Sequence, residues 1–335
     1  MNEAAENQDL NEFLYRNNLL KRGEKAVWTP LAGGVSSDIW RVALPAATIC
    51  VKRALATLKV EADWQAPTER NNYEWEWFRF VNRKFPGIVP RPVAHDREMQ
   101  MLAMEFLAPQ DFKVWKTELL DGAADAEFAA QVGGFLGKIH AASAFDEEIA
   151  ARFATDEFFH ALRIEPYLLA TAEKHPDLAP RIREIAEKTF NAKIALVHGD
   201  VSPKNILIGR DNPIFLDAET AWFGDPAFDL AFCLNHFLLK SVLRPPLAEG
   251  YLGCFEAFAE SYLGAVDWEP RAALEARTAR LLPVLNLARI DGKSPVEYLT
   301  QEESKDRVRQ IARRAIIDPP PSLGVFANNF RASSD

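Results

Sequence analysis

The order of strand-like and helix-like segments constrains this chain most. From residue 26 to residue 107 short apolar strands alternate with polar turns, and only one amphipathic helix interrupts them. Beyond that point most apolar patterns have helical spacing. The sequence therefore predicts an α+β fold with a first domain at 1–107 and a second at 108–335. Strands are expected in the first domain at 26–30, 39–43 and 48–53, with two more flanking the turn at 95–98.

Helices are predicted mainly in the second domain. One helix is expected at 8–22, and another at 69–85, where Tyr73, Trp77 and Phe80 have amphipathic spacing and Pro86 ends the pattern. The remaining predicted helices are 128–142, 180–191, 225–243, 249–263, 270–287 and 302–317, with short strands at 196–197, 206–208 and 213–216. The tail after Pro319 is expected to be exposed coil.

The charge of the chain argues against a nucleic-acid-binding surface. The net charge is −9, whereas neutralising phosphates needs clustered Lys and Arg. The acidic excess lies entirely after residue 107, where 25 basic side chains face 34 acidic ones. Such an excess would attract a cationic substrate. The alternative is that it only keeps the protein soluble.

Neither the N-terminus nor the apolar runs indicate a membrane or export. The longest apolar stretches fall short of the roughly 20 residues that a bilayer span requires, and the acidic N-terminus lacks the pattern of a signal peptide. Three cysteines, Cys50, Cys233 and Cys254, lie in apolar surroundings and fit reduced core thiols. We therefore expect a cytoplasmic protein, and its oligomeric state stays open.

One polar loop between apolar flanks, LVHGDVSPKNILI, indicates chemistry. Asp200 lies at its centre and Asn205 follows five residues later. Phosphoryl transfer to a hydroxyl needs a carboxylate that orients the hydroxyl and accepts its proton, and an amide oxygen nearby can bind Mg²⁺. Asp217 ends a further apolar strand in IFLDAE, and its oxygens suit the same hard cation.

Three motifs, HGDVSPKNIL, LDAE and GDPAFDLA, resemble the aminoglycoside phosphotransferase and choline kinase superfamily, relatives of protein kinases. The resemblance extends over nearly the whole chain. It implies a protein-kinase-like fold of two lobes, with an N-terminal antiparallel sheet and one helix, a larger and mostly helical C-terminal lobe, and ATP between them. It also implies an ATP- and Mg²⁺-dependent kinase that phosphorylates a hydroxyl of a small metabolite, an aminoglycoside-like compound or a sugar-like compound.

The resemblance assigns roles to the motif residues. Asp200 is the catalytic base, and Asn205 and Asp217 bind Mg²⁺ with Glu219 as an additional ligand. His198 resembles a buried histidine that supports the catalytic loop. Asp229 resembles the carboxylate that caps this loop through backbone hydrogen bonds.

In the first domain the resemblance assigns a nucleotide site. Lys52 resembles the strand lysine that binds the ATP phosphates, and Glu74 its helix partner. Glu69 and Glu76 are alternatives, but Glu76 points about 160° away from Glu74 by the helical period. The turn with Gly33, Gly34, Ser36 and Ser37 resembles the phosphate-covering loop. The segment from Met104 to Leu107, with Glu105, resembles the hinge whose backbone binds adenine.

One departure from the family pattern concerns the loop around Asp200. Ser202 and Lys204 stand in the catalytic loop where many members have His or Gly. Lys204 either neutralises the moving phosphoryl group or is an ordinary solvated lysine.

The segments 51–60 and 64–70 resemble methylthioribose kinases, which hints at a sugar-like acceptor.

Polar residues in the helical part are candidates for binding the acceptor. They share apolar surroundings in three stretches, and the alternative for each is a buried ion pair that joins helices. The candidates are Arg163, Glu165, His236, Arg289, Asp291 and Lys293.

Other functions on the same fold remain open at this point. A catalytically silent nucleotide-binding regulator is disfavoured because the lysine, the base and the metal-ligand types are all retained. A methylthioribose-kinase-like sugar kinase is a second alternative. A protein kinase is disfavoured because Gly224 follows Asp217 by only seven positions, which leaves little room for an activation segment. The sequence does not identify the acceptor, nor the preference for ATP or GTP.

Overall fold

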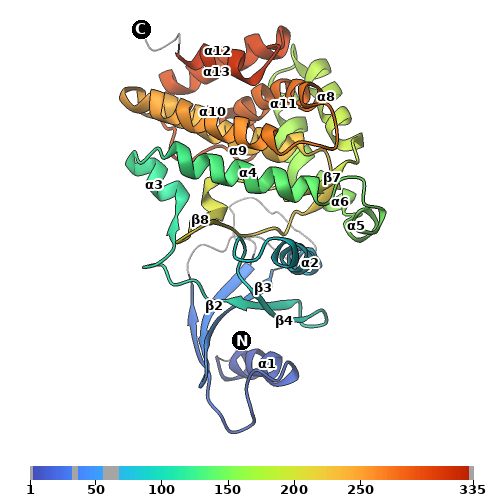
Figure 1. The fold of residues 1–335 in the computed structure, drawn as a ribbon, viewed down its shortest axis with the longest axis vertical. Coiled ribbons are helices and arrows are strands. Elements are labelled where there is room, and N and C mark those ends of the chain that lie inside the picture. Colours follow the sequence, from blue (N-terminus) through green and yellow to red (C-terminus); the bar gives the residue numbers. More distant parts are fainter. Residues whose placement is uncertain (1–2, 32–36, 56–67, 332–335) are drawn as a thin grey trace. The chain divides into compact units, whose positions relative to one another are not determined.

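The computed structural model describes residues 3–31, 37–55 and 68–331 and divides into two compact units (Figure 1). The first unit is Met1–Phe112 with Ile214–Glu219, and the second is Lys113–Pro213 with Thr220–Asp335. The segment Ile214–Glu219 joins the first unit through Phe215, whose N–H donates to the carbonyl oxygen of Ile88 at 2.8 Å. It brings Asp217 and Glu219 with it. The division into domains at residue 107 stays a prediction.

The first unit contains an antiparallel sheet in the order β1-β2-β3-β5-β4. Each strand was predicted from alternating or apolar runs, and the antiparallel sheet with its helical partner confirms the α+β class. The strands are β1 Val27–Pro30, β2 Ser37–Ala43, β3 Thr48–Ala54, β4 Pro92–Asp96 and β5 Met101–Glu105. The register places Lys52 of β3 opposite Leu102 of β5 in the middle of the sheet.

Two helices belong to this unit, α1 (Glu3–Arg16) and α2 (Arg70–Lys84). Helix α1 buries Phe13 and Leu14 in one cluster with sheet residues such as Val51. It ends at Arg16 instead of near 22, and Asn18 just beyond it has a left-handed backbone (φ 55°) that stops the helix. Helix α2 matches the prediction, and its buried face includes Glu74 and Trp77.

The second unit is mostly helical. Its helices are α3 Trp115–Asp121, α4 Ala126–Ala141, α5 Glu147–Arg152, α6 Asp156–Phe159, α7 Ala170–Lys174, α8 Ala179–Asn191, α9 Ala227–Leu243, α10 Ala248–Gly264, α11 Arg271–Asp291, α12 Glu302–Ile317 and α13 Leu323–Arg331, with 3₁₀ turns η2 Pro203–Asn205 and η3 Pro245–Leu247. Helix α9 is buried along almost its whole length, so it forms the centre of this unit.

Short strands border the loops of the second unit. They are β6 Lys113–Val114, β7 Ala195–Val197, β8 Ile206–Ile208 and β10 Trp222–Gly224, and β9 Pro213–Phe215 carries the chain from the second unit to the first. Strand β7 pairs with β10, and β6 pairs with β8, both antiparallel. The predicted strands at 196–197, 206–208 and 213–216 are therefore present.

Helices α4 and α10 lie side by side (Figure 1). Glycines on α4 make this close approach possible, since a Cβ added at Gly133 would lie 2.3 Å from the carbonyl oxygen of Phe258. A Cβ at Gly137 would likewise lie 2.9 Å from the carbonyl oxygen of Tyr262. The glycines in the predicted helix 128–142 therefore serve packing.

The segment η1 (His160–Leu169) is a π-helix, which the sequence analysis did not predict. It contains Pro166, which has no N–H to donate to a regular helical ladder. Its wide turn buries Arg163 and Tyr167. Short π-helical segments are rare and often occur at functional sites.

The expected coil after Pro319 is wrong for residues 323–331, which form α13. Leu323, Phe326, Ala327 and Phe330 recur at helical spacing and are buried. This periodicity is legible in the sequence, and burial of two phenylalanines against the helical unit stabilises a short terminal helix that would be marginal alone.

Cys50, Cys233 and Cys254 are free and buried, as expected. In the part of the chain that the structure describes, no helix is both long and apolar enough to span a bilayer.

Candidate active site

The loop after β7 is held by Asp229 in the first turn of α9. The carboxylate of Asp229 accepts the N–H of His198 at 2.7 Å and the N–H of Gly199 at 2.8 Å. His198 Nδ1 accepts the N–H of Asp200 at 3.2 Å, and all these groups are buried. Asp229 also contacts the ring of His140, which the sequence analysis missed. This is the arrangement that the resemblance implies for His198 and Asp229.

Gly199 is required by its backbone and by its surroundings. Its φ is +81°, and an added Cβ would lie 2.6 Å from the carbonyl oxygen of Thr220. A side chain here would push the loop away from Thr220. The glycine of the HGD motif therefore fixes the direction in which Asp200 points.

Two cations approach the carboxylate of Asp200. Arg163 Nη2 lies 3.2 Å from Asp200 Oδ2, and Lys204 Nζ lies 3.1 Å from the same oxygen. Arg163 also donates to the carbonyl oxygen of Gly199. Asn205 Nδ2 donates to the backbone oxygen of Asp200 at 3.1 Å, which orients the Asn205 side chain next to the loop. Arg163, an acceptor candidate, is thus a direct neighbour of the predicted base.

Lys52 and Glu74 form a buried ion pair in the first unit, with Lys52 Nζ 2.8 Å from Glu74 Oε2. Lys52 Nζ also lies 2.5 Å from Asp217 Oδ1. Burial by itself lowers the pKa of Lys52, but the carboxylates of Asp217, Glu74 and Glu219 raise it above its ordinary value. Glu69 is exposed and Glu76 pairs with Arg79 instead. The helix partner chosen by spacing is the one that the structure shows.

Asp217 and Glu219 lie on the segment that returns to this unit. Asp217 has a left-handed backbone with φ 65°, a conformation that a non-glycine residue rarely adopts and that often marks a functional position. Arg70 Nε donates to Glu219 Oε2 at 3.1 Å, and Arg70 is fully buried. The sequence analysis did not assign a role to Arg70, although an arginine one helical turn before Glu74 was visible.

The donor set fits a magnesium ion in part. Within the described ranges, no three His, Cys, Asp or Glu side chains gather closely enough to hold a metal by themselves. Mg²⁺ usually takes one or two carboxylates and completes its shell with phosphates and water. In the first unit Asp217 and Glu219 supply two such carboxylates, and in the second unit Asn205 carries an amide oxygen.

The structure describes only some of the remaining residues that were predicted to bind the nucleotide. Gly33, Gly34 and Ser36 lie outside the described residues, as do residues 56–60 and 64–67 of the segments that resemble methylthioribose kinases. Ser37 begins β2 and is buried. Glu105 ends β5 and donates its N–H to the carbonyl oxygen of Arg91, and half-buried Leu107 follows.

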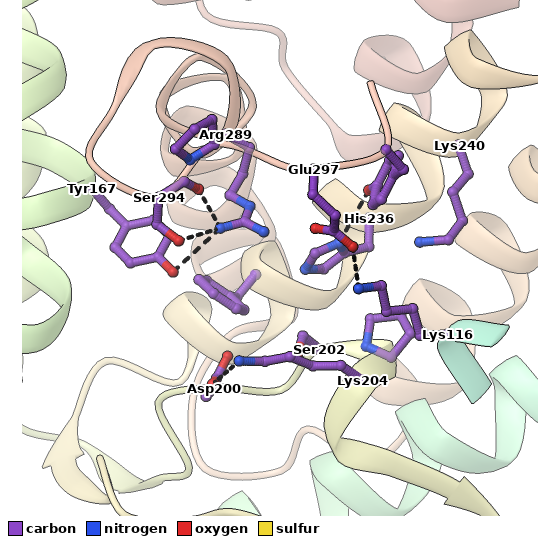
Figure 2. Close-up of a pocket in the computed structure, with 14 residues that line it drawn as sticks. Lys116, Tyr167, Asp200, Ser202, Lys204, His236, Lys240, Arg289, Ser294 and Glu297 are labelled. Carbon is purple, nitrogen blue, oxygen red and sulfur yellow. Dashed lines mark hydrogen bonds and ion pairs between the residues drawn. The ribbon is translucent and has the colours of Figure 1, made fainter. Parts of the chain in front are cut away.

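A cavity of about 180 Å³ opens beside Asp200 in the second unit (Figure 2). Of the six acceptor candidates, His236 on α9 and Arg289 on α11 line it. The cavity also takes Lys116 from α3, Lys240 from α9 and Glu297 from the segment after α11. These three were missed, although Lys240 follows the candidate His236 by four residues and Glu297 follows the candidate Lys293 by four.

The other acceptor candidates form ion pairs away from this cavity. Lys293 Nζ lies 2.6 Å from Glu165 Oε1, and Asp291 pairs with His175 and Arg309. Neither pair belongs to the cavity wall. Glu165, Asp291 and Lys293 therefore form ion pairs, which the sequence analysis gave as the alternative to binding the acceptor.

Residues 27–274 match the Phosphotransferase enzyme family. This range includes the loop around Asp200 and the motifs LDAE and GDPAFDLA. The chain belongs to this family. Two curated relatives are methylthioribose kinases, from Pectobacterium atrosepticum at 23% identity over 225 residues and from Bacillus velezensis at 25% over 252 residues. The alignments take in 59% and 66% of this chain but only 56% and 63% of those relatives, so the chain matches little more than half of their length.

Solved structures related to this family member share its fold. An ethanolamine kinase from Plasmodium vivax gives a TM-score of 0.59 at 14% identity, over 98% of this chain and 91% of that one. A choline kinase from Cryptosporidium parvum gives 0.57 at 14% identity, over 93% and 96%. An amicoumacin kinase in complex with AMP-PNP and Ca²⁺ gives 0.56 at 14% identity, over 98% and 99%. The protein-kinase-like fold that the sequence predicted is thereby confirmed.

Proposed function

We propose that this protein is an ATP-dependent small-molecule kinase that phosphorylates a hydroxyl group, with Asp200 as the catalytic base. One observation carries the proposal: the carboxylate of Asp200 lines a cavity of metabolite size. Hydrogen bonds to Asp229 and His198 hold the loop that carries Asp200. Family membership and the fold support it. A cytoplasmic location and the absence of nucleic-acid binding remain expectations from the sequence.

In the proposed reaction Asp200 orients the acceptor hydroxyl and accepts its proton. The hydroxyl oxygen forms a bond to the γ-phosphorus of ATP, and the bond from that phosphorus to the β,γ-bridging oxygen breaks. The electron pair of the broken bond leaves with ADP. Lys204, which already contacts Asp200, neutralises charge on the transferred phosphoryl group.

The proposed nucleotide ligands are the residues that the resemblance assigned. Lys52, held by Glu74, binds the phosphates, and Asn205, Asp217 and Glu219 are the proposed Mg²⁺ ligands. The metal would neutralise the phosphate oxygens. Support comes from the all-oxygen donor set and from the related amicoumacin kinase, which was solved with a triphosphate analogue and a divalent cation. The phosphate-covering turn and the hinge, including Gly33, Gly34, Ser36, Ser37, Glu105 and Leu107, complete the assignment.

A sugar kinase is the second candidate, because the curated relatives are methylthioribose kinases. It differs from the first proposal only in the acceptor, so a test of acceptors separates the two. A silent regulator would bind nucleotide without transfer, and the test of Asp200 below excludes or supports it.

Substitution of Asp200 by Ala tests the base. We expect turnover in a coupled ADP-release assay to fall by at least about 10²-fold, the range typical of a lost general base, while Mg·ATP affinity measured by calorimetry is kept. Asp217→Ala should instead weaken Mg·ATP binding. Exposed Asp267→Ala is the matched control and should change neither quantity. Wild-type turnover by Asp200→Ala would refute the assignment of the base.

A further inference from the structure

The cavity beside Asp200 has an excess of positive charge. Four basic side chains, Lys116, Lys204, Lys240 and Arg289, line it together with the two carboxylates of Asp200 and Glu297. Both carboxylates already have cationic partners, because Lys204 and Arg163 contact Asp200 and Lys116 contacts Glu297. Within the described part of the chain, this leaves Lys240 and Arg289 without a carboxylate partner.

Lys240 carries a buried amine that finds no hydrogen-bond acceptor in the described part of the chain. Its residue is 1% exposed, and Nζ has no hydrogen-bond partner among the described residues. Its Nζ lies 4.8 Å from the centroid of the Tyr298 ring, and Glu297 favours its charged form from a longer distance. Figure 2 shows the amine directed into the cavity toward His236. An ammonium buried in this way costs folding free energy unless something of opposite charge completes its surroundings.

Arg289 and His236 continue the same wall. Arg289 Nη1 donates to the hydroxyl of Ser294 at 2.9 Å and to its carbonyl oxygen, which hold the guanidinium without neutralising it. Arg289 Nε and His236 Nε2 are buried and have no partner within the described ranges. Burial lowers the pKa of His236 far below its ordinary value, and Lys240, Arg289, Lys204 and Lys116 lower it further. The imidazole is therefore neutral in a strongly positive surrounding.

We propose that the phosphate acceptor is a small hydroxylated anion, whose hydroxyl lies at Asp200 and whose carboxylate or phosphate group is held by Lys240 and Arg289. This inference rests on the proposed kinase function and names the acceptor class. Figure 2 shows Asp200 and Lys204 on one side of the cavity, and Lys240 and Arg289 across it. The anion and the reacting hydroxyl thus occupy opposite ends of one small molecule.

The local charge opposes what the net charge suggested. An acidic chain of net charge −9 would favour cationic acceptors such as choline-like alcohols or amino sugars. In the cavity itself such a cation would meet two unpaired cations at short range, where the dielectric is low and the interaction strong. Local groups outweigh distant ones because solvent and salt screen charges beyond about 10 Å.

An acceptor panel tests the class. Purified protein with Mg·ATP is assayed for ADP release with four small hydroxylated compounds of different charge: glycerol, glycerate, glycerol 3-phosphate and choline, with methylthioribose as an added neutral sugar. We expect kcat/KM for an anionic compound to exceed that of every neutral or cationic one at least about tenfold, the worth of one charge-assisted contact. The ratio of glycerate to glycerol 3-phosphate separates carboxylate from phosphate. Preference for methylthioribose, glycerol or choline would overturn the inference and leave the kinase proposal standing.

Lys240→Met removes the charge at similar length, and exposed Lys188→Met is the matched control. For the anionic acceptor we expect KM to rise about tenfold in Lys240→Met with kcat changed less than about twofold, and no change in Lys188→Met. An equal loss with neutral acceptors would mean that Lys240 serves the nucleotide, contrary to the inference.

A binding readout keeps the inference testable without turnover. Glycerate should raise the melting temperature of the wild type relative to glycerol plus chloride at matched ionic strength, and the rise should vanish in Lys240→Met and in Arg289→Gln. Equal shifts in all three proteins would overturn it. Absent Mg·ATP binding by calorimetry, together with a normal glycerate shift, would instead refute the kinase proposal alone.

Discussion

Lys240 shows how a single residue can mark a ligand class. Almost every residue of helix α9 is buried, and most are apolar, so a methionine or leucine would pack at this position at lower cost. An ammonium that is buried and finds no acceptor among the described residues departs from the usual rule that buried charges are paired. Violations of local rules tend to lie at functional sites, and here the violation faces the cavity that contains Asp200.

The pH dependence of acceptor binding follows from the pKa of Lys240. Burial has the largest effect and lowers this pKa, and the charges of Lys116 and Arg289 also lower it. Cys233 and Glu297 raise it, and together these effects shift the pKa from 10.5 to about 7. His236 and Tyr298 also face the amine. Because only the ammonium attracts an anion, KM for an anionic acceptor should rise as pH increases from about 7 to 9.

Steady-state kinetics from pH 6 to 9 measure this effect. The Lys240→Met variant is the control, since its KM should be high and should lack the rise near neutral pH. An identical pH profile of KM in both proteins would contradict the role of Lys240.

At the scale of elements, the pair α4 and α10 depends on small residues at the contact. The glycines of α4 let its backbone approach α10 to a distance that a Cβ would prevent. Helix α4 carries His140, which contacts Asp229 below the catalytic loop. The spacing of these two helices therefore supports the loop as well as the core.

Gly133→Ala tests this packing. The added Cβ would meet the backbone of Phe258, which has no flexible end to move, so we expect a loss of about 1–3 kcal/mol in the free energy of unfolding. Gly253→Ala on α10 is the matched control, because a Cβ there meets nothing within 4 Å. It should be neutral or stabilise by up to about 1 kcal/mol. Urea unfolding measures both, and equal effects would refute the packing role.

At the scale of the whole molecule, stability and acceptor binding oppose each other at Lys240. The folded pKa is about 7 and the unfolded value is 10.5, so between these values the unfolded chain binds more protons than the folded one. Stability of the wild type then increases with pH across that window relative to a variant without this group. Below about pH 7 the full cost of burying the charge is present.

We therefore expect Lys240→Met to melt at least about 1–2 °C higher than the wild type at pH 6.5, the shift that about 1 kcal/mol gives for a chain of this length. The difference should shrink as pH rises toward 9. Calorimetric melting without ligand measures it, with Lys188→Met as the control that should follow the wild type. A melting temperature below that of the wild type at pH 6.5 would show that the amine stabilises the free protein.

The sequence by itself determined the class of fold and, in the first unit, the order of strands and helices, whereas η1 and several short helices of the second unit were not predicted. Alternating and apolar runs predicted the strands of the first unit. Helical spacing selected Glu74 over Glu76 as the partner of Lys52, because local periodicity decides which side chains share a face. The same reasoning applied after Pro319 would have found α13, whose apolar residues recur at helical spacing. The motif around Asp200 and Asn205 identified the loop before any coordinates did.

Only the tertiary structure decided which polar residues surround the predicted base. Arg163, His236 and Arg289 reach Asp200 or its cavity, whereas Glu165, Asp291 and Lys293 form ion pairs elsewhere. Lys116 and Lys240 come from helices more than a hundred residues apart. Burial and charge pairing depend on how distant segments pack, whereas a sequence pattern describes only neighbouring residues. The positive charge of the cavity therefore follows only from the folded chain.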